Sequence, residues 1–578
     1  MEHSALHALQ LTGLVLALGG PLLVLGLLRP VCRALGPDPA RDRLAAALEV
    51  QVVRWVCGGA LVAGLSTISD LFVQTAELRQ RTVFGGVDLA LLWRFATQTT
   101  VGQLAVARAG LLLAAAGAIR LPDRIRWRLT GVLAGTAVVA ASLVSHAAAQ
   151  PTGRDVAVVA QVLHIAGVGA WMGVLVHLLV GRRLIEGATA PGAAALVAGV
   201  VGRFSPVALV AVGAIFVSGL YGAVRYVGTP TELVASAYGL TLTVKMILLL
   251  GVLYAGAINF RVVRPALLQL AAAARLAPLR GGAPTVSPSL PVGAVETDAA
   301  AGRTRDATSA ASTLRLFGRM LELEVTAGVV MIAVAGILGS ISPPGDDGTA
   351  RLTPVQLAAV WSPHLPSPEF VDPATFIDEA DRTLNDLRYG EFMHNWAGVF
   401  VTFMGLFWLM QSVGGVPGAV ATRLWPFLLV PFAAFISAFA DPEVFVLGRV
   451  TFREAIGDST VVEHQLGAVM LLIMVWLGRR DAMRPPEQRP MGPALPIVMM
   501  FGSFLLLGHA HSSLGATDEL TTLINVQHAV LGGGGLLAGA VRWFTLRDLF
   551  PRRLGNLLWP SLITAIGLFM ALCYREVT

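Results

Sequence analysis

The sequence predicts an all-α fold, a polytopic membrane bundle of about fourteen transmembrane helices. Apolar residues make up 55% of the 578 residues and charged residues only 13%, which is too apolar a balance for a soluble globular protein. Apolar runs of about 17–25 residues also recur along the whole chain. Because the lipid core offers the backbone no hydrogen-bond partner, runs of this length are expected to be helices.

The predicted spans form two sets. The first lies at residues 9–28, 52–73, 101–119, 129–149, 156–180, 204–226, 238–262 and 321–341. The second lies at residues 393–410, 424–440, 461–477, 493–509, 523–541 and 555–574. We therefore expect an eight-helix unit (1–342), an extracytoplasmic loop (343–391) and a six-helix unit (392–578). Residues 271–311 are rich in Ala, Pro, Gly, Ser and Thr, which predicts a flexible cytoplasmic linker inside the first unit.

Arginine placement predicts the orientation. If the spans alternate, the arginines of the short loops gather on one side, for example those from Arg120 to Arg128, the pair Arg182 and Arg183, and those from Arg542 to Arg553. The positive-inside rule makes that side the cytoplasm and places both termini outside. The net charge of +6 is thereby explained by topology, and nucleic acid is not an expected partner.

Histidines are biased toward the predicted outer side. His177 alone lies toward the cytoplasmic end of a span. Imidazole in a membrane either finds a hydrogen-bond partner or binds a metal, and intramembrane ionisable groups are functional candidates. The predicted metal ligands are His3, His7, His146, His164, His394, His464, His509, His511 and His528.

Four of these histidines are followed, about one turn later, by a glycine. The pairs are His164 with Gly167, His394 with Gly398, His464 with Gly467 and His528 with Gly532. Glycine lets a neighbouring helix approach closely, so imidazoles from several helices could converge on one ion. The N-terminus offers a separate possibility, because a histidine at position 3 could complete a square-planar copper(II) site with the amine and two amide nitrogens.

Four segments of the first unit carry a resemblance. They read SHAAAQPTGRDVAVVAQVLHIAGVGAWMGVLVH, RFSPVALVAVGAIFVSGLYGAVRYVG, YGLTLTVKMILLLGVLYAGAINFRVVRP and LELEVTAGVVMIAVAGILGSISPPG. In order and spacing this resembles the copper resistance protein D family of bacterial inner-membrane proteins. The resemblance implies copper transport and homeostasis across the cytoplasmic membrane, with uptake or delivery that contributes to copper resistance. It also implies a transport path that includes Trp171, Arg203, Ser218, Tyr238, Lys245 and Asn259.

The six-helix unit lies outside that family pattern, and two interpretations stay open. Its outer histidines could relay copper from the first unit, or they could hold b-type haem in a membrane redox protein. The chain contains no phosphate-binding Walker loop, no GxSxG and no HExxH motif, so we expect no enzyme and no ATP-driven pump. The expected partners are the copper ion, the lipid bilayer and a periplasmic copper chaperone or copper enzyme.

Overall fold

The structure is a computed structural model that describes residues 2–79, 83, 86–188, 190–269, 272, 292–345, 351–376, 384–483, 494–508 and 519–576. Twelve helices within these ranges are long and apolar enough to cross a bilayer. The only β pairing in the described chain is an isolated bridge between Val444 and Val450. The predicted all-α, multi-pass membrane bundle is therefore confirmed.

Eight predicted spans have counterparts in the first part of the chain. These are α1 with η1 and α2 (Glu2–Pro21, Leu22–Leu28, Arg29–Leu35), α3 (Pro39–Glu77), α5 (Thr100–Ala118), α6 (Asp123–Ser142), α8 with η3 and α9 (Arg154–Val168, Gly169–Gly173, Val174–Val180), α11 (Pro191–Tyr226), α13 with η4 (Ala237–Ile258, Asn259–Val263) and α15 (Val292–Leu338). Shorter helices between them are α4 (Leu89–Gln98), α7 (His146–Ala149), α10 (Arg182–Glu186) and α12 (Glu232–Ala235).

The last six predicted spans also have counterparts. These are α17 (Leu384–Val413), α18 (Gly415–Phe439), α20 (Ser459–Ala482), α21 (Ala494–Gly508), α22 (Glu519–Leu546) and α23 (Arg552–Leu572). Short helices on this side are α16 (Pro354–Val360), η5 (Pro373–Thr375) and α19 (Phe452–Ala455). Two of the fourteen predicted spans are not among the twelve long apolar helices. They are α6, whose first turns are charged, and α21, which has only 15 described residues.

The predicted linker over 271–311 differs from the structure at its C-terminal end. Helix α15 begins at Val292 and runs without a break into the membrane-spanning segment, so residues 292–311 are helical. Alanine is the strongest helix former, and the alanine-rich stretch extends the helix that follows it. The rest of the predicted linker lies outside the described residues, apart from residue 272.

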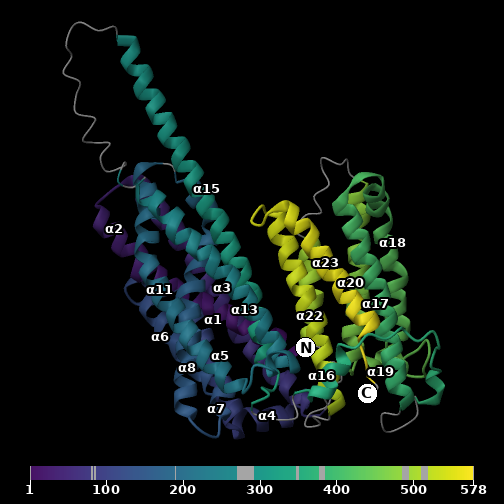
Figure 1. Cartoon of the computed structure of the whole chain (residues 1–578). Helices are drawn as coiled ribbons and strands as arrows, with labels where there is room; N and C mark the ends of the chain where they lie inside the picture. The colour runs from purple at the N-terminus through teal and green to yellow at the C-terminus, as the bar shows by residue number, and fades with distance from the viewer. Residues whose placement is uncertain are drawn as a thin grey trace.

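Both termini lie at the same end of the bundle, as Figure 1 shows, while the N-terminal part of α15 projects from the opposite end. A shared side for the two termini agrees with the alternation of spans. We call the end that carries the termini the outer end, following the positive-inside prediction. The short helices α4, α7, α16 and α19 also lie at this end (Figure 1).

The helices form two groups that pack against each other. A large apolar core joins α1, α3, η3, α9, α11 and α15, and a second core joins α17, α18, α20, α21, α22 and α23. A third cluster bridges the groups and includes Val244, Leu248 and Val334 on one side and Leu507 and Leu536 on the other. We call this third cluster the seam. The division into units at 343–391 stays a prediction, although the two cores lie on either side of it.

Two backbones touch in the first group. A methyl group added at Gly19 of α1 would lie 2.3 Å from the carbonyl carbon of Gly173 in η3, and one added at Gly173 would lie 2.4 Å from the carbonyl oxygen of Val15. Only glycine permits helices to approach this closely. The contact lies in a π-helical turn that interrupts the helix from Arg154 to Val180 and also carries Trp171.

Candidate functional site

A polar cluster lies at the outer end of the first group, between α1 and α3. Nδ1 of His3 donates to Oδ1 of Asp70 at 2.6 Å, and the His3 and His7 rings are 6.1 Å apart. Asp70 is only 4% exposed, and Nε2 of Gln74 donates to its second oxygen at 2.9 Å. Buried Arg108 donates to Oε1 of a neighbouring glutamine of α1 at 2.8 Å. A buried carboxylate is thus held beside two imidazoles.

His3 is not arranged as a square-planar N-terminal chelate. Helix α1 begins at Glu2, and the imidazole turns toward Asp70 on α3. The amine of Met1, which would complete such a chelate, lies outside the described residues. The structure instead makes His3 part of the α1–α3 cluster.

His146 begins a row of three aromatic rings. The predicted fourth span ends earlier than expected, at Ser142, and His146 begins the separate helix α7. Its ring packs edge-on against Tyr226 with 6.5 Å between ring centroids, and Tyr226 packs against Tyr238 at 6.2 Å. His146 is also within electrostatic range of His7, which connects this aromatic row to the His3–Asp70 pair.

His164 is held between α8 and α11. Its Nδ1 lies 3.0 Å from Oγ of Ser218, and that hydroxyl donates to the carbonyl oxygen of Ala214 at 2.6 Å. The Ser218 oxygen therefore accepts from the imidazole, which leaves Nε2 as the nitrogen that carries the ring's lone pair. Lys245 of α13 is within electrostatic range of His164, so two sequence-predicted path residues and this histidine share one region.

The remaining path residues are spread along the first group. Trp171 is buried in the α1–η3 core, and Arg203 is exposed on α11. Nδ2 of Asn259 donates to Oε1 of Glu324, a side chain that is buried in α15. Asn259 begins η4, the π-helical turn that ends α13. These residues do not meet at one point.

Glu322 forms ion pairs with two arginines at the cytoplasmic side of this region. Its two oxygens accept from Nη1 of Arg182 and Nε of Arg547. Arg182 belongs to the first group of helices and Arg547 follows α22, so one carboxylate bridges both groups. This bridge has no signature in the local sequence, because Arg547 is more than 200 positions away.

His394 and His528 come together in the second group. Their rings pack edge to face with 5.2 Å between centroids, and the ring of Tyr574 stacks flat on His394 at 4.0 Å. Nδ1 of His394 donates to the carbonyl oxygen of Gly390 at 2.8 Å, and Nδ1 of His528 donates to that of Ile524 at 2.9 Å. Both rings are therefore fixed in the tautomer whose Nε2 carries the lone pair.

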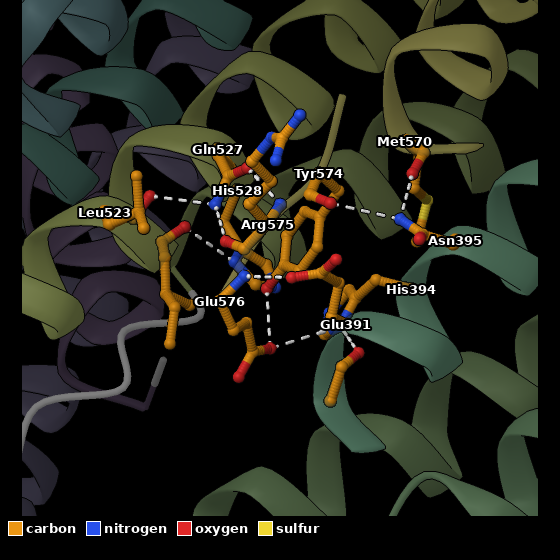
Figure 2. A network of polar contacts seen from close by, with 12 residues as sticks. Glu391, His394, Asn395, Leu523, Gln527, His528, Met570, Tyr574, Arg575 and Glu576 are labelled. Carbon is orange, nitrogen blue, oxygen red and sulfur yellow. Dashed lines mark hydrogen bonds and ion pairs between the residues drawn. The ribbon is translucent and has the colours of Figure 1, made fainter. Parts of the chain in front are cut away.

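The C-terminal segment Tyr574–Glu576 folds back onto this pair, as Figure 2 shows. Gln527 binds both the N–H and the carbonyl oxygen of Arg575, at 2.8 and 2.7 Å. Oε1 of Glu576 lies 3.5 Å from Nδ1 of His394 and accepts from the Tyr574 hydroxyl at 3.1 Å. Glu576 is not among the predicted site residues, because nothing in the local pattern shows that the segment turns into the bundle.

A cavity of about 580 Å³ opens below the His394–His528 pair, within the second group. His464 of α20 lines the same cavity, and its Nδ1 donates to Oδ1 of Asp441 at 2.8 Å. Glu463 lies beside it and is only 8% exposed. Three of the predicted histidines thus reach one cavity from three helices, although His464 is held by a separate carboxylate.

Methionines make up much of the cavity wall, which sequence analysis did not foresee. They are Met393, Met404, Met470, Met474, Met499 and Met570. In the sequence only Met393 is adjacent to a histidine, so the local pattern gives no sign of this lining. The others converge from α17, α20, α21 and α23, and this convergence is a property of the tertiary fold.

The close helix contacts predicted from the histidine–glycine pattern occur at three of its four positions. A methyl group at Gly167, Gly398 or Gly532 would lie within about 3 Å of atoms of a neighbouring helix. At Gly467 it would meet nothing within 4 Å, because this glycine lines the cavity. The prediction is therefore confirmed for the first three glycines and wrong for Gly467.

Among the described residues, no group of three or more His, Cys, Asp and Glu side chains is arranged to hold a metal ion. Two pairs of predicted ligands form, His3 with His7 and His394 with His528, whereas His146, His164 and His464 contact side chains of other kinds. His509 and His511 lie outside the described residues. His177 is buried, and its Nε2 donates to the carbonyl oxygen of Leu16 at 3.0 Å, so it holds α9 against α1.

A haem does not fit between His394 and His528 as they are arranged. Axial imidazoles on opposite faces of a haem are separated by the macrocycle and its iron. These two rings instead contact each other edge to face, and the ring of Tyr574 covers one face of His394. The pair therefore cannot sandwich a haem without rearrangement.

Comparison with protein families gives two matches. The model described as copper resistance protein D matches residues 198–285. The model described as copper resistance protein D-like, N-terminal domain matches residues 3–156. Searches of curated proteins and of solved structures found no match. The two matched ranges contain His3, Asp70, Ser218, Lys245 and Asn259, and neither reaches the last six helices.

Proposed function

The chain is a member of the copper resistance protein D family, and from this premise we propose that its first group of helices carries copper ions inward across the bacterial cytoplasmic membrane. Family membership makes it a copper-handling membrane protein. The proposal adds the site of capture, the route and the direction. It is a carrier rather than an enzyme.

Capture is proposed at the His3–His7–Asp70 cluster. The single observation that supports it most is the buried Asp70 carboxylate, 2.6 Å from His3 at the outer end of the membrane helices. A buried carboxylate offsets the cost of taking a cation out of water, and imidazole nitrogens are good copper ligands. The copper resistance protein D-like N-terminal match spans all three residues.

The proposed route continues through polar groups between α8, α11, α13 and α15. Nε2 of His164 carries the ring's lone pair and offers the next donor. The Asn259–Glu324 pair offers buried oxygens closer to the cytoplasm. A membrane potential that is negative inside favours inward movement of a cation by about 2.3 kcal/mol per charge per 100 mV. Inward transport therefore requires no nucleotide.

Copper accumulation in bacterial cells tests this proposal. The full chain is expressed in a strain with low copper uptake, and cell-associated copper is measured against the amount of protein in the membrane. The variant His3→Gln/Asp70→Asn is expected to lower accumulation to the level of the empty vector, because it removes one donor and the compensating charge. The matched control is Asp548→Asn, which removes an exposed carboxylate outside both regions that are proposed to bind copper. Unchanged accumulation in the His3/Asp70 variant would refute capture at this cluster.

A further inference from the structure

We propose that the cavity of the second group is a copper(I) site, in which Nε2 of His394 and of His528 and methionine thioethers are the ligands, and in which Glu391 and Glu576 form the entry. This inference rests on the proposed function, since it assumes that the chain handles copper. It assigns a second site to helices that neither family match covers.

The charge of the cavity selects a cation. Among the described residues that line it, six are acidic and none is lysine or arginine. The acidic residues are Asp386, Asp441, Glu443, Asp458, Glu463 and Glu576. A cavity lined by charge of one sign in a low-dielectric surrounding attracts ions of the opposite sign. An anionic or acidic ligand would be repelled.

The imidazole pair is already oriented for metal binding. Nδ1 of His394 and Nδ1 of His528 each donate to a backbone carbonyl four residues earlier, at 2.8 and 2.9 Å. Histidines that bind metals commonly use such a bond on one nitrogen to fix the tautomer and the ring direction for the other. The two rings come from α17 and α22, and their centroids are 5.2 Å apart.

The methionines narrow the choice of metal to a soft one. Six methionines line the cavity, and Met393, Met404, Met470, Met474 and Met499 are each less than 10% exposed. Thioether sulfur is a soft ligand that favours copper(I) over hard cations such as magnesium and calcium. Imidazole and thioether ligands together suit a soft ion such as copper(I).

An entry path leads from the outer loop to the histidine pair. Nε2 of His364 lies 3.3 Å from Oε1 of Glu391, and the other oxygen of Glu391 accepts from the backbone N–H of Glu576 at 3.0 Å. The Glu576 carboxylate lies 3.5 Å from Nδ1 of His394. Two carboxylates, Glu391 and Glu576, thus lie between the partly exposed loop residue His364 and the histidine pair, of which His528 is only 2% exposed.

The position of Glu576 is secured by backbone contacts. Gln527 holds the main chain of Arg575, and Nδ2 of Asn395 donates to the carbonyl oxygen of Tyr574 at 3.1 Å (Figure 2). Because these anchors do not use the Glu576 side chain, Glu576→Gln is expected to keep the segment in place while removing the negative charge. This variant therefore separates an effect on the ion from an effect on folding.

Copper(I) binding to the purified full chain tests the inference. The protein in detergent is titrated with copper(I) under anaerobic conditions against a chromogenic copper(I) chelator. The wild-type chain is expected to bind two equivalents, one in each group of helices. His394→Gln/His528→Gln is expected to lose one equivalent. Met570→Leu, one turn before the Tyr574 ring that stacks on His394, is expected to weaken that site, and Glu576→Gln to weaken it about 10-fold.

This experiment tests the cavity site and the site at His3 and Asp70 independently of each other. His3→Gln/Asp70→Asn is expected to remove the other equivalent and to leave the cavity site intact. If the His394/His528 variant elutes as a folded monodisperse protein and still binds two equivalents, the inference is wrong while the proposed function stands. Sulfur in the copper coordination shell, seen by X-ray absorption, supports the site. A Soret band that shifts on reduction of the purified chain would overturn it in favour of haem.

Discussion

The contact between Gly173 and α1 predicts that a single methyl group will destabilise the first group of helices. In Gly173→Ala the new carbon would lie 2.4 Å from the Val15 carbonyl oxygen and 2.8 Å from Cα of Gly19. Both distances run from the new carbon to backbone atoms of α1, so no side chain can rotate away and the helices must separate. Overpacking of this kind costs about 1–3 kcal/mol. The higher helix propensity of alanine offsets about 1 kcal/mol of that cost.

The matched control for this variant is Gly110→Ala in α5, where an added methyl group meets nothing within 4 Å. Its effect is expected to stay within about 1 kcal/mol. Both variants are compared with the wild type by unfolding in increasing SDS, followed by tryptophan fluorescence in mixed micelles. A Gly173→Ala variant as stable as Gly110→Ala would refute the reasoning. Copper accumulation should fall with Gly173→Ala, because Trp171 lies in the same turn.

Three further predictions concern buried polar contacts. Burial opposes ionisation of Glu232, but its hydrogen bonds from Arg351 and a backbone N–H outweigh that effect and lower the pKa of the carboxyl. The stability that the carboxylate contributes is therefore present above its unfolded pKa of about 4.3 and is lost as the pH falls through the folded pKa. Glu232→Gln should reduce this loss of stability at acid pH when unfolding is measured from pH 7 to pH 3. Glu322→Gln should destabilise the chain more than Arg547→Met in the same SDS assay, because Arg547 is 45% exposed and its ion pair contributes about 1 kcal/mol or less. Gln527→Leu should cost about 1–3 kcal/mol for each main-chain group it leaves without a partner and should make the C-terminal segment sensitive to carboxypeptidase.

The membrane fold could be predicted from the sequence because lipid imposes a simple rule. Every spanning segment must satisfy its own backbone and must be apolar, so length and composition identify it. The rule is weakest where a helix carries charge or is short, as in α6 and α21. It also does not limit how far a helix extends into water, which is why the helical start of α15 at Val292 was missed.

The candidate sites were predictable only as a set of histidines. The outer bias of the histidines identified His394, His464 and His528, and the structure brings all three to one cavity. The pairing of His394 with His528 depends on how α17 and α22 pack, which no local pattern encodes. Glu576 and most of the methionines were missed for the same reason, since each lies far along the chain from the residues it joins.

The seam between α13 and α15 on one side and α21 and α22 on the other holds the two groups together without help from the covalent connection between them. Membrane helices form independently of one another and associate afterwards through packing, and here Val244, Leu248 and Leu507 supply that packing. The segment from 343 to 391 then acts mainly by keeping the local concentration of one group high around the other. Two separately translated half-chains, cut before this segment, should therefore find each other in the same bilayer and reconstitute the bundle.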